Sequence, residues 1–502
     1  MNKTLLIALL LAVSAALGAK LIGGKVVDPS GRGISSVLVS DGESKAYSSD
    51  DGAFRITTDR DSLHFSRLGY KALSLPVDEL AKQVVLAPEP VLLPKVTVSE
   101  SAWNFISPPA DRVALPVDPD RHYQSTGDIV TSGAAARSND LRLAGESQEI
   151  SILGNLARHS LVIVDGVALN PGGESFDLSL IDPGLIESVE LIKNNASVYG
   201  GGAAIGGILN IRTRQGLSSG GEDFSLGMEL GSFGYAKTSL ALGLKPRGAD
   251  LRLNASHLDT DNDFSYKVAD WWAPDSVAVR ENNGKRQNSI SASVSVPFRQ
   301  SRLSLQSDYV AFHRQLPGTV NFSEVYRNAF LKGYASRNRF TAGLPLRALN
   351  ADLLAWLNLD ATVYDNTRAP IPVYLSHYRQ KLLDTGLRCS LGGEMGLSRR
   401  LKLSSGLAAE IGAKRYQNHN LLTPAQILDH RAAFANASFK SGLELDLDDL
   451  ILNGAGALRY DRAGANDNLS WRLEGSLKNI SFVETILGGT WGTSFALPSP
   501  YD

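Results

Sequence analysis

The chain has 502 residues, enough for several domains, with 50 basic and 52 acidic side chains and a net charge of −2. This balance lacks the concentrated positive charge of nucleic-acid-binding proteins, so we expect no nucleic-acid partner. Hydrophobic residues make up 43%, which suits a soluble protein and also a membrane β-barrel, whose strands alternate apolar and polar residues. The single cysteine, Cys389, excludes an intrachain disulfide and a cysteine-based zinc site.

Residues 1–19 have the pattern of a secretory signal peptide. Lys3 supplies positive charge, an apolar stretch follows from Leu5 to Val13, and small side chains surround a cleavage site near Gly18. The apolar stretch is shorter than the roughly 20 residues that a membrane-spanning helix needs. We therefore expect an exported protein.

Residues 20–88 are expected to form a small β-sandwich, because short β-prone runs alternate with turns rich in Asp, Gly and Pro. The patterns G-x-V-x-D-x-x-G-x-x-I from Gly24, D-D-G-x-F from Asp50 and L-G-Y from Leu68 resemble carboxypeptidase-regulatory-like domains. The resemblance implies a module of the kind often fused ahead of outer-membrane receptors. None of the eight histidines begins an HxxE or HExxH zinc motif, so no carboxypeptidase chemistry is expected.

Residues 89–119 are dense in proline, which favours an extended linker. Within this linker lies one short β-prone stretch without an obvious partner strand: Lys95, Val96, Thr97, Val98, Ser99 and Glu100. One interpretation is a further edge strand of a neighbouring domain. The other is an exposed strand that pairs with the sheet edge of another protein.

Residues 120–215 carry the most specific pattern. Leu161–Val167 reads as a buried strand that ends in a tight turn, and residues 186–193 alternate apolar and charged side chains, as in a strand with one wet face. The run VDGVALN from Val164, followed by IDPGLIESVELIKNNASVYGGGAAIGGILNIRTRQG from Ile181, closely resembles the plug domain of TonB-dependent receptors. The positions that carry the resemblance are Asp165, Gly166, Glu187, Glu190, Lys193, Tyr199, Gly200, Gly206, Gly207 and Asn210.

The chain departs from the family pattern at two positions. Leu153 stands where the family often has arginine, which would add polar contacts, and Asn194 stands where it often has glycine. Asparagine tolerates a left-handed backbone, so the turn at Asn194 can survive. The glycine cluster lacks the Lys-Ser/Thr ending of a phosphate-binding loop, so we interpret it as a close approach between strands.

Residues 216–502 repeat ten-residue runs of alternating polarity, which predicts an antiparallel transmembrane β-barrel over a soluble β-sandwich. In the run 237–244 the even positions are bulky and apolar, so Leu242 is expected to face lipid and Lys237 the lumen. The fold class is therefore mainly β: a small sandwich, an α+β plug and a barrel.

Two barrel segments resemble family loops. Asp259–Tyr266 looks like a calcium loop, but Phe264 and Asp270 occupy positions where an EF-hand needs glycine and glutamate. Within the family it resembles an S-D-N-D-F-x-Y stretch, and Leu316–Gly318 resembles a PG loop. Both match siderophore and cobalamin receptors best. We expect structural roles for them first, and ligand or calcium binding second.

The strand count predicts an incomplete barrel. About thirteen candidate strands follow residue 220, whereas plugged transporters have about 22, and an odd antiparallel set cannot close without a parallel pair. The segment Gly492–Asp502 resembles the family's GTSFRxPSxxDLY motif, which normally has several strands after it. We therefore expect the natural chain to continue past Asp502; the alternative is a smaller barrel that ends there.

The resemblance implies a receptor of the bacterial outer membrane that is not an enzyme and needs no cofactor or resident metal. It implies active uptake of a scarce small molecule, with an iron-siderophore or cobalamin favoured. The implied partners are outer-membrane lipid and a TonB-type inner-membrane energising complex, which would pair with Lys95–Glu100. The alternatives are uptake of glycans or peptides, a binding barrel without energy coupling and, least favoured, an exported enzyme.

Overall fold

The computed structural model describes residues 20–87, 112–215 and 222–495, apart from residues 30, 43, 68–69, 81, 116, 119–120, 122, 133–134, 140–142, 195, 268–275, 319–322, 347–348, 371–375, 424, 448–449, 465 and 480–484. The expected signal peptide, the segment Lys95–Glu100 and the chain from residue 496 onward lie outside the described residues. By its internal contacts the chain divides into two compact units, residues 1–99 and 100–502.

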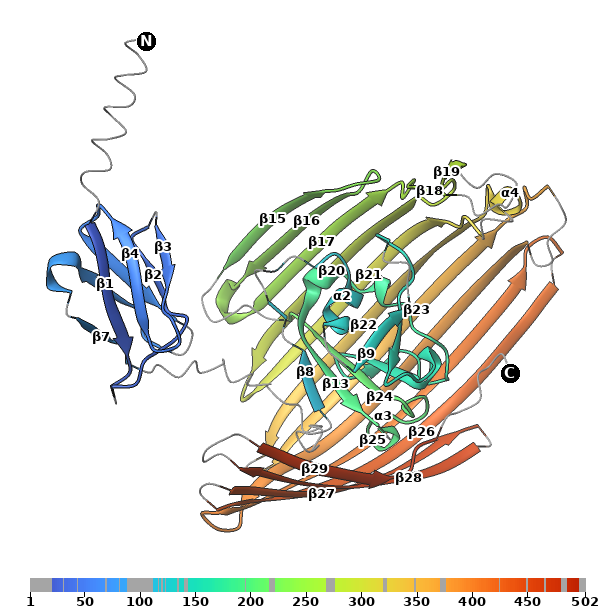
Figure 1. Cartoon of the computed structure of the whole chain (residues 1–502). Coiled ribbons are helices and arrows are strands. Elements are labelled where there is room, and N and C mark those ends of the chain that lie inside the picture. Colours follow the sequence, from blue (N-terminus) through green and yellow to red (C-terminus); the bar gives the residue numbers. More distant parts are fainter. Residues whose placement is uncertain are drawn as a thin grey trace, which may run out of the picture. The chain divides into compact units, whose positions relative to one another are not determined.

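The first unit consists of two small sheets around one apolar core (Figure 1). The sheets have the strand orders β4-β1-β7 and β3-β2-β5-β6. Phe54 and Phe65 meet edge to face in the core, with ring centroids 5.4 Å apart. The bounds are β1 Lys20–Val27, β2 Leu38–Ser40, β3 Lys45–Tyr47, β4 Ala53–Thr58, β5 Ser62–Ser66, β6 Leu73–Pro76, η1 Val77–Glu79 and β7 Gln83–Val85.

The second unit begins with the plug, whose five-stranded sheet has the order β12-β11-β14-β13-β8. Strand β11, between β12 and β14, is buried at every residue, as its apolar sequence predicts. No helix in the described part of the chain is long and apolar enough to cross a membrane. The bounds are β8 Arg112–Leu115, α2 Thr126–Thr131, β9 Ala136–Asn139, β10 Glu149–Ile152, η2 Ala157–His159, β11 Ser160–Val164, β12 Val167–Ala168, η3 Leu178–Leu180, η4 Pro183–Leu185, β13 Ile186–Lys193, α3 Ser197–Gly200 and β14 Gly207–Thr213.

The edge strand β8 lies within the range 89–119 that the proline content assigned to the linker. It pairs antiparallel with β13 from Val189 to Ile192. Leu115 is buried in the plug core together with residues of β11 and β13. The plug sheet therefore begins earlier in the chain than the composition indicated.

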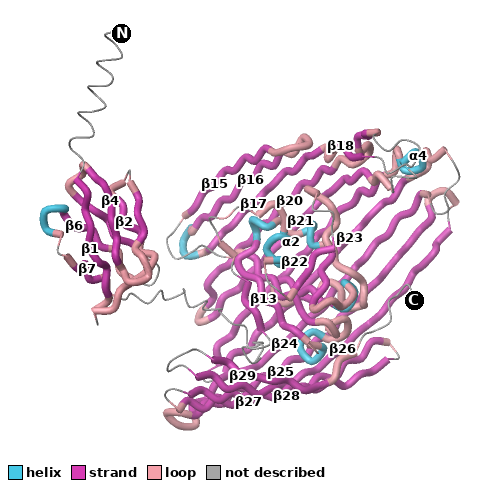
Figure 2. Tube along the Cα trace, in the orientation of Figure 1, coloured by secondary structure: helices cyan, strands magenta, loops and turns pink. Residues whose placement is uncertain are grey.

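Thirteen of the remaining strands form one antiparallel sheet in chain order, hereafter the wall (Figures 1 and 2). This confirms the predicted β architecture and its strand count. Among the described strands, β15 and β29 each have a single neighbour. The bounds are β15 Asp223–Leu230, β16 Ala236–Leu244, β17 Asp250–Thr260, β20 Lys285–Phe298, β21 Ser301–Gln315, β22 Phe330–Leu346, β23 Leu349–Asp365, β24 His377–Gly396, β25 Leu401–Asn420, β26 Ala425–Asp446, β27 Leu450–Ala463, β28 Asn466–Asn479 and β29 Thr485–Gly492.

One face of the wall is polar and contacts the plug, and the other is apolar and exposed. On β16, Lys237 is buried and lies 3.3 Å from Asp182 of the plug, which confirms that it points inward. Because strand side chains alternate, Leu242 belongs to the opposite face. On β15 the even positions Phe224 to Leu230 are all exposed, as expected for side chains that meet lipid.

The two ends of the wall differ in the length of their connections. Short turns at 245–249, 299–300 and 397–400 lie at one end, the short-turn end. Longer connections at 261–284, 316–329 and 366–376 lie at the other, the long-loop end, and include β18 Ser265–Lys267, β19 Val277–Val279 and α4 Ser323–Tyr326. Outer-membrane barrels place short turns in the periplasm and longer loops outside the cell.

A charge on the outward face of β16 should destabilise the folded chain according to its depth in the membrane. Leu240 lies at the middle of β16, and Leu242 lies nearer the turn at 245–249. We expect Leu240→Arg to cost about 2–4 kcal/mol and Leu242→Arg less, because the penalty falls toward the interface. The free energy of folding into lipid vesicles, compared between each variant and the parent, measures this cost. Leu240→Phe is the apolar control, and equal costs for Leu240→Arg and Leu240→Phe would contradict the assigned facing.

Candidate functional site

Asp165 and Gly166 form the turn between β11 and β12, where the sequence predicted it. Their φ angles are 47° and 84°, the left-handed region that a type I′ turn needs at both central positions. The Asp165 carboxylate accepts hydrogen bonds from the backbone N–H and the hydroxyl of Thr213, at 2.8 and 2.7 Å. The turn is thereby fastened to the end of β14.

Two arginines of the wall hold this turn, and together with it they form the turn clamp. Arg339 of β22 lies 3.1 Å from the Asp165 carboxylate and also pairs with Asp308 of β21. Arg388 of β24 donates a hydrogen bond to the carbonyl oxygen of Gly166 at 2.7 Å. Burial raises the pKa of Asp165, while the charge of Arg339 and the hydrogen bonds from Thr213 oppose the rise.

A second contact with the wall arises in the glycine-rich segment. Tyr199 of α3 is buried, and its hydroxyl donates a hydrogen bond to Glu474 of β28. The Arg472 guanidinium lies 5.5 Å from the centre of the Tyr199 ring, and it donates a hydrogen bond to the carbonyl oxygen of Asn194 at 2.7 Å. Folding therefore joins α3 to β28, although the two elements lie far apart in the sequence.

The glycines of this segment let backbones approach closely, as predicted. A Cβ atom on Gly200 would lie 2.2 Å from the Leu161 side chain, and one on Gly206 would lie 2.9 Å from that of Asn155. Gly207 has a φ of 140°, and its Cβ atom would lie 2.4 Å from the carbonyl oxygen of Ile192. Each contact lies inside the plug, so the glycines serve plug packing.

Alanine at position 207 should loosen the plug. Gly207→Ala combines a strained backbone with a clash against the β13 ladder, so we expect rapid proteolysis of the plug in the purified receptor. Gly172→Ala is the control within the plug, because its Cβ atom would meet only the flexible Glu174 carboxylate. Equal digestion rates for the two variants would contradict this role of Gly207.

The charged positions of β13 lie apart from the turn clamp. Glu190 accepts a hydrogen bond from the side-chain amide of Asn210 at 3.2 Å and lies 3.8 Å from Arg112 of β8. Glu187 is exposed and Lys193 is half-buried. Glu190 thus joins neighbouring strands of the plug sheet and stabilises the plug itself.

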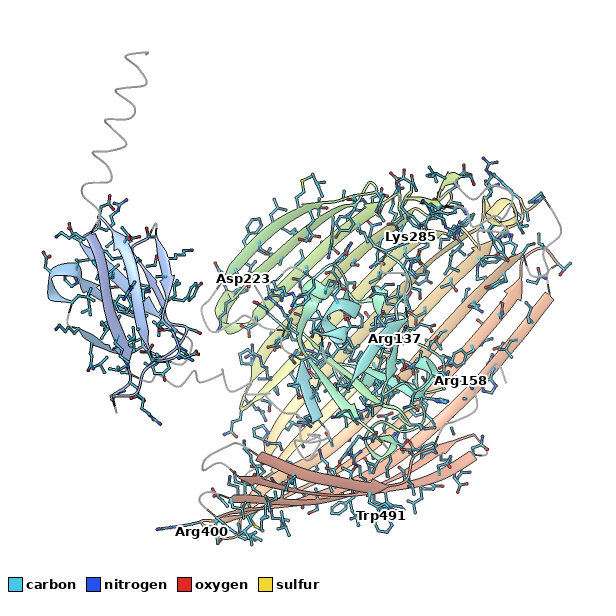
Figure 3. The ribbon with its side chains drawn as sticks, in the orientation of Figure 1. Arg137, Arg158, Asp223, Lys285, Arg400 and Trp491 are labelled. Carbon is cyan, nitrogen blue, oxygen red and sulfur yellow. The ribbon has the colours of Figure 1, made fainter. Side chains whose placement is uncertain are left out.

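Sequence reasoning missed three acidic residues through which the plug meets the long-loop end of the wall. Asp177 pairs with Arg314 of β21 at 2.6 Å, and Asp182 accepts a hydrogen bond from Ser256 of β17 at 2.5 Å. Glu146 lies 3.2 Å from Lys285 of β20, which Figure 3 labels. Nothing in the spacing of these residues along the chain could have shown the pairs.

Asp177 shows how the wall stabilises charge in the plug. Burial acts to raise the pKa of Asp177, but the Arg314 guanidinium and the hydrogen bonds from Ser179 outweigh it, so the pKa lies below its ordinary value. Asp177 is thus held as a carboxylate at neutral pH. Its attraction to Arg314 fastens the plug to β21.

The loops that the sequence singled out have structural contacts. Asn262, with a φ of 49°, donates a hydrogen bond to the carbonyl oxygen of Ala144 in the plug at 2.9 Å. Gly318 has a φ of 65°, and its carbonyl oxygen accepts a hydrogen bond from Arg280. In the part of the chain that the structure describes, no group of three or more His, Cys, Asp or Glu side chains is placed to hold a metal ion.

The two departures from the family pattern fit their turns. Asn194 has a φ of 57°, which confirms that asparagine replaces glycine in a left-handed position. Leu153 also has a positive φ, 52°, and its side chain is 46% exposed. Leucine there leaves an apolar side chain on the plug surface where arginine would have added polar contacts.

The plug thus has an apolar interior and a polar interface with the wall. Fourteen buried hydrophobic residues form one of its core clusters, whereas its contacts with the wall include many ion pairs and hydrogen bonds. Polar interfaces between domains allow relative motion more readily than apolar ones.

Comparison with known proteins agrees with this architecture. Residues 119–208 match the family described as TonB-dependent Receptor Plug Domain. The copper transporter OprC is similar in structure, with a TM-score of 0.59, 14% identity, and coverage of 77% of this chain and 63% of OprC. The siderophore receptor PirA from Acinetobacter baumannii gives a TM-score of 0.60 at 14% identity, covering 78% of this chain and 61% of PirA.

The ferric enterobactin receptor PfeA of Pseudomonas aeruginosa is similar to the same degree, with a TM-score of 0.60 and 15% identity. The match covers 78% of this chain and 63% of PfeA. The chain thus spans about three fifths of the length of these solved structures. At these identities the likeness shows the fold, and the plug match confirms the resemblance that the sequence indicated.

Proposed function

We propose that this chain, whose plug domain and strand architecture are those of TonB-dependent receptors, takes up a scarce small-molecule ligand across the bacterial outer membrane. An iron-siderophore or cobalamin is the favoured ligand. A TonB-type inner-membrane complex supplies the work, because the outer membrane holds no nucleotide energy source. The partner pairs with Lys95–Glu100 by β-augmentation and pulls on the plug.

The observation that carries this proposal is the polar interface between plug and wall. The turn clamp, the Tyr199–Glu474 contact and the Asp177–Arg314 pair connect the plug to β21, β22, β24 and β28. Such contacts hold the plug against the wall when no partner pulls on it. They are also contacts that a pulling force can exchange for water without exposing the apolar core of the plug.

The similar proteins favour a metal complex as ligand. One is a copper transporter, one a siderophore receptor and one a ferric enterobactin receptor. Each of these names concerns a metal or its chelate, which supports the same ligand class here over glycans and peptides. Cobalamin, itself a metal complex, belongs to this class.

Growth of a strain that lacks the gene tests the proposal. Iron chelates, cobalamin and oligosaccharides are supplied one at a time as the limiting nutrient, with the restored gene as control. We expect the strain to grow poorly when the limiting nutrient is an iron chelate or cobalamin, and to grow normally on the oligosaccharides. A defect confined to oligosaccharides would establish the alternative ligand class, and no defect on any nutrient would reject uptake.

A further inference from the structure

A group of uncharged polar side chains lies on the inner face of the wall, at the long-loop end. Its members come from three adjacent strands, β23, β24 and β25 (Figure 1). Strand pairing sets them in neighbouring rows, with the two amide side chains opposite each other and two tyrosines opposite each other. We call this group the neutral patch: Thr362, Tyr364, Tyr378, Gln380, Tyr416 and Asn418.

Alternation along the strands shows that the neutral patch faces the plug side of the wall. Gln380 and Arg388 lie on the same face of β24, and Arg388 donates a hydrogen bond to the carbonyl oxygen of Gly166 in the plug at 2.7 Å. Asn418 shares the inner face of β25 with Glu410, the partner of Arg388. Apart from the buried Tyr416, every member of the patch is half-buried, so its polar groups remain accessible to a ligand.

The positive charges on this inner face are neutralised by carboxylates. Among the described residues, each Lys and Arg that β20 to β25 turn inward forms an ion pair. The pairs toward the long-loop end are Lys285–Glu146 at 3.2 Å, Arg314–Asp177 at 2.6 Å, Arg337–Asp360 at 3.7 Å and Lys414–Asp384 at 3.9 Å. This sector of the interior therefore offers no free cation to an anionic ligand.

The neutral patch instead combines flat rings with hydrogen-bonding groups. The rings of Tyr364 and Tyr378 lie 5.2 Å apart at an angle of 31°. The side-chain amides of Gln380 and Asn418 can both donate and accept, and the amide oxygen of Asn418 has no partner among the described residues. An uncharged ligand with amide or hydroxyl groups gains contacts here, whereas an anion loses its hydration without gaining an opposite charge.

We propose that the neutral patch selects an electrically neutral metal complex over an anionic one. The groups that bind the metal set the charge of a ferric chelate. Three singly charged hydroxamates balance Fe³⁺, whereas three doubly charged catecholates leave an excess of negative charge. The ligand class is thus a ferric trihydroxamate or a neutral corrinoid, and a ferric tris-catecholate is rejected because its charge stays unpaired. This inference rests on the proposed function, since it concerns the ligand that is taken up.

Equilibrium binding of metal complexes to the purified full-length chain in a neutral detergent tests this selectivity. The probes are a ferric trihydroxamate, a ferric tris-catecholate and cyanocobalamin. The measurement is made at a pH above the range in which histidine titrates, so that His430, opposite Tyr416 on β26, adds no charge. We expect the chain to bind a neutral complex and to show no binding of the tris-catecholate at the concentration that saturates the neutral one.

Asn418→Arg places a free cation in the neutral patch. Its neighbours across the strands are Gln380 and Leu428, neither of which is acidic. This variant should gain binding of the ferric tris-catecholate. Gln417→Arg is the matched control, because it adds the same charge one residue away on the opposite face of β25, and it should bind like the parent.

Three outcomes would overturn the selectivity: a preference of the parent for the tris-catecholate, no gain in a folded Asn418→Arg variant, or an equal gain in both variants. Thermal unfolding verifies that the variants fold. If Asn418→Arg does not fold, the preference of the parent between the two iron chelates still decides. Binding of none of the probes would reject the proposed ligand class together with this inference, whereas binding of the tris-catecholate alone would reject only the inference.

Discussion

Replacing Val98 by proline is expected to abolish energised uptake while ligand still binds at the cell surface. A strand added to the sheet of another protein is held by backbone hydrogen bonds, and proline removes the N–H donor at the centre of Lys95–Glu100. In the proposed function, ligand capture depends on the outer side of the protein, so it should persist. Uptake of a radiolabelled iron chelate, with binding measured separately on de-energised cells, separates the two steps.

Val98→Ala is the matched control, because it shortens the side chain and keeps the backbone donor. We expect this variant to transport at close to the parental rate. Normal uptake by Val98→Pro would show that the segment has no part in coupling. Loss of surface binding as well would show a defect in folding or export.

Replacing Arg339 by alanine is expected to release the plug from β22 and make the outer membrane leaky. The Arg339 side chain is 3% exposed and lies between the carboxylates of Asp165 and Asp308. Removing the cation leaves two buried negative charges without their partner, a loss of about 3–5 kcal/mol. Cells that carry Arg339→Ala should become sensitive to a large antibiotic that intact outer membranes exclude.

The double variant Arg339→Ala/Asp165→Asn makes the test specific for the turn clamp. Asparagine removes one of the stranded charges and keeps an acceptor for Thr213, so it should restore part of the barrier. Lys402→Ala is the control for a wall cation, because its pair with Glu444 is exposed, and no leak is expected. An intact barrier in Arg339→Ala would contradict the role of the clamp.

The strand pattern of the wall could be predicted from the sequence because it depends on local alternation. Side chains on a strand alternate between two faces, so the run 237–244 was enough to place Lys237 inward. The turns of the plug could be predicted for the same reason, because their conformations depend on the residues of the turn itself. Asp165, Gly166 and Asn194 have left-handed backbones, and their residue types favour that conformation wherever the rest of the chain lies.

The residues that pair across the interface between the plug and the wall could not be predicted from local patterns. Asp165 meets Arg339, and Tyr199 meets Glu474, through contacts that depend on strand register and on the position of the plug against the wall. A shift of one residue in register would turn Arg339 to the opposite face and separate the first pair. Neither residue type nor spacing in the sequence encodes that register.

The sequence by itself thus determined the plug motif, the alternation of the strands and the conformations of the turns, because each arises from neighbouring residues. Only the tertiary structure decided that β8 joins the plug sheet, that Arg339 and Arg388 hold the turn, and that Tyr199 meets Glu474. These partners lie far apart in the sequence. They become neighbours because strand pairing fixes their register, and pairing between distant segments is a property of the folded chain.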